Sequence, residues 1–196
     1  MVPVKALEDK ILKEGEVFPG NILKVGSFLN QQIDTAFMNL MGEEGRRLFE
    51  DAGITKVLTV EASGIAFAFA VASKLGVPMV FAKKHGASNV SGDVYKASVY
   101  SFTHKKTFDI VVSRDFLSAG DVVLICDDFL ANGNALNGLI HITEDAGAKV
   151  AGALIAVEKG FQGGGDLLRA EGVRLESLAI IDSMEDGNIV FRESSD

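Results

Sequence analysis

Two adjacent carboxylates, Asp127 and Asp128, follow an apolar run in the stretch VVLICDDFLANGNA, residues 122–135. Neighbouring carboxylates repel each other in a poorly solvated site, so both stay ionised only if hydroxyl donors, a metal ion or another cation stabilises them. A vicinal diol would supply such donors. The small residues ANGNA open into a helical pattern, whose free backbone N–H groups favour a phosphate. A diol-binding pair beside a phosphate-binding loop is the chemistry that a ribose 5-phosphate requires.

The acidic pair also has a simpler explanation. A solvated turn that caps a helix is the commoner role of two acids after a strand, and for the pair alone we favour it. The complete order of strand, acidic pair, small-residue loop and helix favours a binding function instead. Ligands of open α/β sheets collect beyond the carboxyl ends of the strands, and we expect Asp127 and Asp128 at such an end.

The elements that must position these residues alternate between β-rich runs and helix-period segments. This alternation predicts an α/β fold with a central, largely parallel sheet flanked by helices. We predict strands over 54–60, 78–82, 97–103, 108–114, 122–128, 149–159, 173–181 and 188–191, and helices over 64–76, 133–147 and 166–172. The strands over 97–103 and 108–114 form an antiparallel ribbon. The polar stretch 83–97 is predicted as a loop, and the mixed segment 11–34 as a cap over the sheet edge.

Composition narrows the class of protein. The 196 residues favour one domain over 1–196, and the net charge of −8, without a Lys/Arg cluster, disfavours binding to nucleic acid or to an anionic membrane. The single cysteine, Cys126, excludes an internal disulfide and suits a reducing compartment. The N-terminus has no uninterrupted apolar segment of the kind that export signals carry. We therefore expect a cytoplasmic protein.

The stretch VVLICDDFLANGNA resembles the phosphoribosyl diphosphate signature of the type I phosphoribosyltransferases. TVEASGIAFAFA resembles the pyrophosphate loop of that family, and LKVGSFLNQQID, ASVYSFT and AVEKGFQ resemble its xanthine-specific members. The resemblance implies the type I phosphoribosyltransferase fold, with a small N-terminal hood over about residues 1–35 that helps to bind the base. It also implies a flexible loop over 84–106 that closes over the site, and a homodimer.

The activity implied by the resemblance belongs to purine salvage. Ribose 5-phosphate would pass from phosphoribosyl diphosphate to N9 of xanthine, giving xanthosine 5'-monophosphate and pyrophosphate. Mg²⁺ would arrive bound to the diphosphate oxygens, without a dedicated metal site on the protein.

The resemblance also assigns roles to individual residues. Asp127 and Asp128 would bind the ribose hydroxyls as the catalytic pair. The 5-phosphate would lie in the loop of Ala131, Asn132, Gly133, Asn134 and Ala135, and the pyrophosphate against Ala62, Ser63, Gly64 and Lys83, with Lys84 as the alternative lysine. The base would contact Leu23, Asn30, Lys159 and Phe161. From the residues alone, Leu23 is expected in the core, Asn30 and Ser63 as helix caps, and the two lysines as surface residues.

Two positions depart from the family pattern. Many relatives have Thr where this chain has Asn132, and some 6-oxopurine enzymes have Asp where this chain has Ala131. That Asp can assist deprotonation of the purine, and Ala131 cannot. Xanthine is among the more acidic common purines, so its anion is accessible near neutral pH and a dedicated base matters less.

Other functions remain open at this stage. The base is alternatively guanine, hypoxanthine or adenine, or the chain is a non-catalytic regulator that senses phosphoribosyl diphosphate, or a nucleotide-binding α/β protein of other chemistry. Three further features are assigned no function. His85, His104 and His141 lack metal-ligand spacing, Cys126 is interpreted as a small buried hydrophobe, and the glycines 163–165 as a flexible turn.

Overall fold

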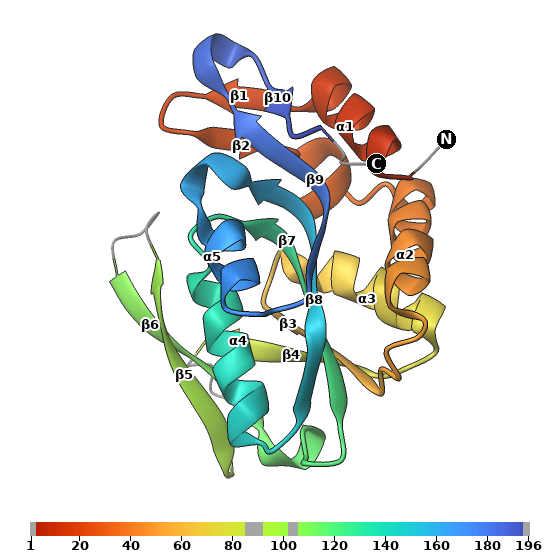
Figure 1. The fold of residues 1–196 in the computed structure, drawn as a ribbon, viewed down its shortest axis with the longest axis vertical. Helices are drawn as coiled ribbons and strands as arrows, with labels where there is room; N and C mark the ends of the chain where they lie inside the picture. Colours follow the sequence, from red (N-terminus) through yellow and green to blue (C-terminus); the bar gives the residue numbers. More distant parts are fainter. Residues whose placement is uncertain (1–2, 85–91, 102–105, 194–196) are drawn as a thin grey trace.

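A twisted sheet forms the centre of the molecule (Figure 1). The computed structural model describes residues 3–84, 92–101 and 106–193. Within these ranges, eight strands lie in the order β10-β9-β8-β7-β3-β4-β6-β5. Their bounds are β3 Lys56–Val60, β4 Met79–Lys84, β5 Val94–Ser101, β6 Lys106–Ser113, β7 Val122–Leu130, β8 Lys149–Lys159, β9 Leu175–Ser183 and β10 Val190–Phe191. Strands β4, β3, β7, β8 and β9 run parallel, and β5, β6 and β10 pair antiparallel, which confirms the predicted α/β fold.

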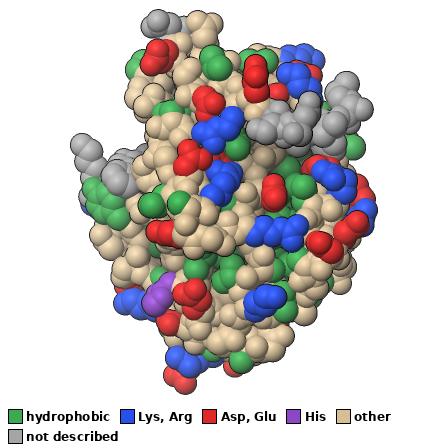
Figure 2. All heavy atoms as spheres, viewed as in Figure 1, with side chains coloured by type: hydrophobic (Ala, Val, Ile, Leu, Met, Phe, Trp, Pro, Cys, Tyr) green, Lys and Arg blue, Asp and Glu red, His purple; other side chains and the backbone are tan. Residues whose placement is uncertain are grey.

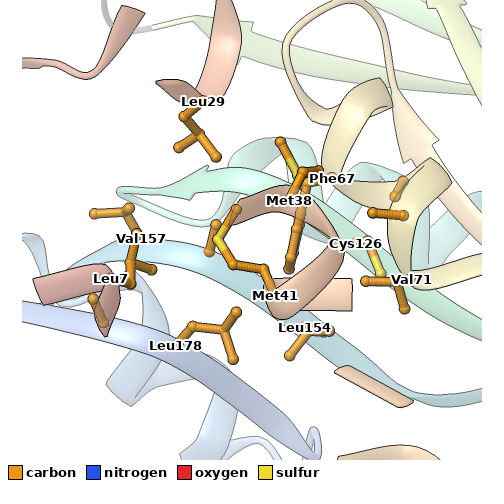
Figure 3. Close-up of a cluster of buried hydrophobic side chains, with 14 of the residues drawn as sticks. Leu7, Leu29, Met38, Met41, Phe67, Val71, Cys126, Leu154, Val157 and Leu178 are labelled. Atoms are coloured by element: carbon orange, nitrogen blue, oxygen red, sulfur yellow. The ribbon is translucent and has the colours of Figure 1, made fainter. Parts of the chain in front are cut away.

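Helices cover both faces of the sheet. Helices α2 (Thr35–Phe49) and α3 (Gly64–Leu75) lie on one side, and α4 (Asn134–Asp145) and α5 (Gly164–Ala170) on the other (Figure 1). The alternation of strand side chains divides the core accordingly. In β7, Leu124 and Cys126 pack with the cluster under α2 and α3, whereas Val123 and Ile125 pack with the cluster under α4. Figure 3 shows the first cluster, including Cys126 among its apolar neighbours.

The N-terminal segment is more regular than predicted. It contains helix α1 (Pro3–Glu14), a hairpin of β1 (Glu16–Phe18) and β2 (Ile22–Lys24), and a turn of π-helix η1 (Gly26–Asn30). Helix α1 was not predicted, although its fully buried Leu7 and Ile11 lie four positions apart on one helical face. In Figure 1, α1, the hairpin and β10 lie together at one end of the sheet.

The predicted loop over 83–97 contains the ends of two strands. The prediction of a loop is wrong at both ends of the polar stretch 83–97, because β4 continues to Lys84 and β5 begins at Val94. In β5, buried Ala97 and Val99 alternate with exposed neighbours and pack against Gly138 of α4, so one apolar face is enough to hold a polar strand. Of the predicted closing loop over 84–106, residues 85–91 and 102–105 lie outside the described residues.

The prediction of a flexible turn over 163–165 is also wrong. Gly164 and Gly165 are buried and open helix α5. Behind them lies an ion pair: Arg169 donates from Nη1 and Nη2 to the two carboxylate oxygens of Glu158, at 2.9 and 2.7 Å. Glu158 is 0% exposed on β8, so this pair fixes α5 against the sheet.

We expect Arg169→Met to destabilise the fold strongly. Removing one partner of a buried pair leaves an uncompensated charge and costs about 3–5 kcal/mol. In a chain of this length that lowers Tm by roughly 6–20 °C. Thermal unfolding followed by circular dichroism measures the shift, and the double variant Glu158→Gln/Arg169→Met should recover most of it. A single variant with the wild-type Tm would show that the pair does not stabilise α5.

Candidate functional site

The acidic pair lies at the carboxyl edge of the parallel strands. Asp127 and Asp128 are 8% and 4% exposed, and β7 continues past them to Leu130 by pairing with β8. The predicted strand end is therefore two residues too early, although the predicted edge of the sheet is right. The turn after β3, the end of β4 and Lys159 at the end of β8 lie at the same edge, because these strands run parallel to β7.

Asp128 joins three segments of the chain. Its Oδ1 accepts a hydrogen bond from Ser63 Oγ at 2.9 Å, and its Oδ2 accepts one from Asn30 Nδ2 at 3.1 Å. Ser63 belongs to the turn that opens α3, and Asn30 to the π-helical turn of the N-terminal segment. The structure thus brings one residue from each of three predicted subsites, for ribose, pyrophosphate and base, into direct contact.

Asp127 is also buried, but the hydrogen bond that it accepts comes from the neighbouring backbone rather than from a distant side chain. Its Oδ1 accepts the backbone N–H of Asp128 at 3.0 Å. Burial raises the pKa of Asp127 well above its ordinary value, and the neighbouring charge of Asp128 raises it further. A substrate that offers hydroxyl donors or positive charge would stabilise the ionised form of Asp127.

The turn before α3 approaches the acidic pair closely. A β-carbon at Gly64 would lie 2.5 Å from both Asp127 Oδ1 and Thr59 Oγ1, so only glycine fits there. The hydroxyl of Thr59 is fully buried and, within the described residues, has no hydrogen-bond partner. Ala62 and Ser63 are exposed just ahead of Gly64, where their backbone can face a ligand.

The predicted phosphate loop lines a cavity of about 240 Å³. Its lining includes Asp127, all five loop residues from Ala131 to Ala135, and Tyr100 and Phe108 from the β5–β6 ribbon. Gly133 adopts a φ of 83° immediately before α4, a conformation that favours glycine. Asn134 Nδ2 donates to the backbone oxygen of Tyr100 at 3.1 Å and ties the loop to β5. The free N–H groups at the start of α4 give this cavity the character of an anion site.

The two lysines that end β4 face different sides of the strand. Lys83 lines a separate groove, with its Nζ 5.9 Å from the ring centroid of Phe81. Lys84 Nζ lies 5.3 Å from the ring centroid of Phe108, a wall of the phosphate cavity. The backbone N–H of Lys84 also donates to Glu61 Oε1 in the turn before α3, at 2.7 Å. The geometry therefore brings Lys84, rather than Lys83, toward the other site residues.

The residues predicted to contact the base differ in how far they are exposed to solvent. Lys159 Nζ donates to the backbone oxygen of Asn21 at 2.8 Å and lies 5.6 Å from the ring centroid of Phe129. Burial lowers the pKa of Lys159. Phe161 is 37% exposed just after β8, whereas Leu23 is buried in the core cluster that includes Phe28. The hairpin that carries Asn21 thus lies directly against the end of β8.

Two residues that were assigned no function, His141 and Cys126, lie on the surface and in the core respectively. His141 is exposed and its Nε2 lies 3.5 Å from Asp145, and His85 and His104 fall outside the described residues. Cys126 is fully buried, which raises the pKa of its thiol. Within the described ranges, no three His, Cys, Asp or Glu side chains are grouped to hold a metal ion. No helix described here has the length and apolar character needed to cross a bilayer.

Several site residues have no local signal in the sequence. Thr59 is one polar residue in an apolar strand, Tyr100 one aromatic residue in a ribbon, and Lys84 one of two adjacent lysines. The strand alternation of β4 carries the only clue for Lys84, because its side chain must face the same side as buried Ala82. From the residues alone Ser63 was expected as a helix cap, but its side chain makes no capping hydrogen bond and donates to Asp128 instead.

Comparison with known proteins identifies the family. The family model described as a phosphoribosyl transferase domain matches residues 31–167. The chain therefore belongs to the phosphoribosyltransferase family, and its type I fold is as predicted.

Close relatives cover nearly the whole chain. The xanthine phosphoribosyltransferase of Lachnoclostridium phytofermentans is 54% identical, over 96% of this chain and 98% of the relative. The xanthine phosphoribosyltransferase of Heliobacterium modesticaldum is 58% identical, over 96% of this chain and 100% of the relative. Among solved structures, the APRTase of Giardia lamblia in complex with 9-deazaadenine has a TM-score of 0.75 at 28% identity, with 89% of this chain and 96% of that chain covered.

Proposed function

We propose that this chain is a purine salvage enzyme that transfers ribose 5-phosphate from phosphoribosyl diphosphate to N9 of xanthine, with xanthosine 5'-monophosphate and pyrophosphate as products. The contact of Asp128 with both Ser63 and Asn30 carries the proposal. It places the acidic pair between the residues assigned to pyrophosphate and those assigned to the base, and the reacting C1 of the sugar must lie between the same two groups.

Each part of the site has a defined task in this reaction. Asp127 and Asp128 accept hydrogen bonds from the ribose hydroxyls, and the loop from Ala131 to Ala135 holds the 5-phosphate. The turn from Ala62 to Gly64 takes the pyrophosphate, with Lys84 better placed than Lys83 to add positive charge. Purine N9 attacks C1 as pyrophosphate leaves, through a transition state with oxocarbenium character. The protein contributes positioning and stabilisation of leaving-group charge.

Mg²⁺ would arrive bound to the oxygens of the diphosphate, because Mg²⁺ prefers oxygen ligands and substrate phosphates to a cage of protein ligands. The acidic pair would remain available to the ribose hydroxyls. When bound, Mg²⁺ neutralises charge on the diphosphate.

Xanthine is the base that the site and the relatives favour together. Lys159 offers an ammonium to a purine carbonyl oxygen, and Ala131 offers no group to deprotonate a less acidic purine. The relatives that are 52–58% identical and nearly full length bear the name xanthine phosphoribosyltransferase. The Giardia protein, bound to an adenine analogue, is 28% identical. Adenine carries no carbonyl oxygen for Lys159 to bind.

The remaining expectations belong to the same proposal. Residues 1–35 contribute the hood over the base, consistent with the contacts of Asn30 and Asn21, and the chain acts in the cytoplasm. It forms a homodimer, for which the groove of about 730 Å³ along β4 and β6, with Phe116 59% exposed, offers an apolar surface. Elution as a monomer in size-exclusion chromatography would contradict the homodimer.

A regulator that senses phosphoribosyl diphosphate is the second candidate. Such proteins append a DNA-binding module, and the acidic balance of this chain disfavours DNA. Figure 2 shows acidic and basic side chains interspersed on one face of the molecule, without a single basic patch there. The catalytic function is therefore preferred.

The deciding experiment measures pyrophosphate release with phosphoribosyl diphosphate, Mg²⁺ and each of xanthine, guanine, hypoxanthine and adenine. We expect the highest kcat/KM with xanthine, and loss of turnover after Asp127→Asn/Asp128→Asn. Preference for another base would keep the sugar site and overturn the role of Lys159. Binding of phosphoribosyl diphosphate without turnover on any base would favour the regulator.

A further inference from the structure

The glycines at 163–165 lie behind the phosphate loop, outside the residues that contact the proposed ligand. The backbone N–H of Gly164 donates to the oxygen of Ala131 at 3.2 Å. A β-carbon on Gly164 would overlap that same oxygen, and would lie 2.5 Å from the carbonyl carbon of Asn132 and 2.7 Å from the nitrogen of Gly133. All three nearest atoms are backbone, so no side-chain rotation can make room. The loop therefore lies directly on Gly164.

A second residue of helix α5 packs near the phosphate loop. A β-carbon on Gly133 would lie 3.2 Å from Cδ1 of Leu168, a buried residue one turn along α5 from Gly164. Gly133 is the residue whose φ of 83° turns the chain into α4. Leu168 thus packs over the turn that gives the phosphate loop its shape.

The helix that makes these contacts is itself fixed to the strand that carries Lys159. Arg169 of α5 holds buried Glu158, the residue before Lys159, through two hydrogen bonds. A β-carbon on Gly165 would overlap Glu158 Oε1, so this glycine lets the helix approach β8 closely. The glycines and the ion pair together give α5 one position, against the phosphate loop on one side and β8 on the other.

We propose that Gly164 is a positioning residue for the 5-phosphate, which sets the backbone of residues 131–133 from behind without touching the ligand. The inference rests on the proposed function, because it assigns the 5-phosphate to this loop. A displacement of the loop changes the directions of its N–H groups toward the phosphate oxygens. It leaves the turn from Ala62 to Gly64, on the other side of the acidic pair, in place.

The test compares the binding of two ligands by isothermal titration calorimetry. Xanthosine 5'-monophosphate carries the 5-phosphate, and pyrophosphate with Mg²⁺ does not. For Gly164→Ala we expect the Kd of the nucleotide to rise by about 10- to 100-fold, as misplacement near 1 Å does in other sites, with pyrophosphate affinity within about twofold of wild type. Gly120→Ala is the matched control, because a β-carbon there meets nothing within 4 Å, and it should bind both ligands as wild type does.

A second variant guards against a folding defect. Leu168→Val shortens the side chain that lies beside Gly133 and retains a buried apolar residue, and we expect a smaller selective loss of about threefold. It decides the question if circular dichroism shows that Gly164→Ala does not fold. Unchanged nucleotide affinity in the deciding variant, or equal loss of both ligands, would overturn the positioning role. Failure of the wild-type protein to bind xanthosine 5'-monophosphate would instead contradict the proposed function.

Discussion

Asp127→Asn should reduce kcat/KM with xanthine by about 10²- to 10⁴-fold. A hydrogen bond to a charged group contributes about 1.5–3 kcal/mol, and the carboxylate can accept from two ribose hydroxyls, so its loss removes roughly 3–6 kcal/mol of binding in the transition state. The initial rate of pyrophosphate release measures the effect. Activity within tenfold of wild type would show that Asp127 does not contact the sugar.

The same substitution should stabilise the free protein at neutral pH. Burial raises the folded-state pKa of Asp127, so the folded state binds more protons than the unfolded state over the interval between the two pKa values. Wild-type stability therefore falls as pH rises above about 4, the ordinary pKa of an aspartate, until the folded pKa is passed. The amide of Asp127→Asn does not ionise and carries no such penalty. We expect the Tm advantage of this variant to be absent below about pH 4 and to grow as the pH rises toward neutral.

Asp128→Asn is the matched comparison for stability. Asp128 accepts hydrogen bonds at both oxygens, from Ser63 and Asn30, and a neutral amide would lose the extra strength that the carboxylate charge gives to both bonds. This variant should be less stable than wild type at neutral pH, in contrast to Asp127→Asn. Equal Tm shifts in the two variants would contradict the distinction between Asp127, whose pKa burial raises, and Asp128, which accepts from two side chains.

Lys159→Gln should raise the KM for xanthine by about 10- to 100-fold, the loss of one charged hydrogen bond of roughly 1.5–3 kcal/mol. Lys159 is partly buried, and its ammonium donates one hydrogen bond to the backbone oxygen of Asn21. Because an ammonium carries three protons, a ligand can accept from it as well. Residual activity with adenine should change far less, because adenine has no carbonyl oxygen. The ratio of kcat/KM values for the two bases is the quantity to compare.

Lys149→Gln controls for the loss of charge. Lys149 begins the same strand β8 that Lys159 ends, and it is exposed at the opposite edge of the sheet. Its substitution removes the same charge without touching the site, so the KM for xanthine should stay within about twofold of wild type. If both variants weakened xanthine equally, Lys159 would act through net charge rather than through a contact with the base.

Much of the site is visible in contiguous residues. The string from Val122 to Ala135 contains a strand, two acids, a loop of small residues and a helix start, and each follows from side-chain period, charge and size over a few residues. The order of the strands and helices was predictable for the same reason, apart from α1, α2, the hairpin of β1 and β2, and the ends of β4 and β5. In α1 and at the ends of β4 and β5, polar residues are mixed with the apolar residues of a single buried face. The local pattern therefore did not predict a helix or a strand at these places.

The amino-acid sequence alone determined the class of fold, the acidic pair, the phosphate loop and the resemblance to the phosphoribosyltransferases, because each depends on neighbours along the chain. Only the tertiary structure decided which distant residues meet. The contact of Asn30 with Asp128 spans 98 positions, and it exists because the N-terminal segment lies over the carboxyl edge of β7 and β8. The role of Gly164 is likewise invisible in a run of three glycines. It follows from the close approach of α5 to the phosphate loop, which the packing of β8 and its buried Glu158 sets.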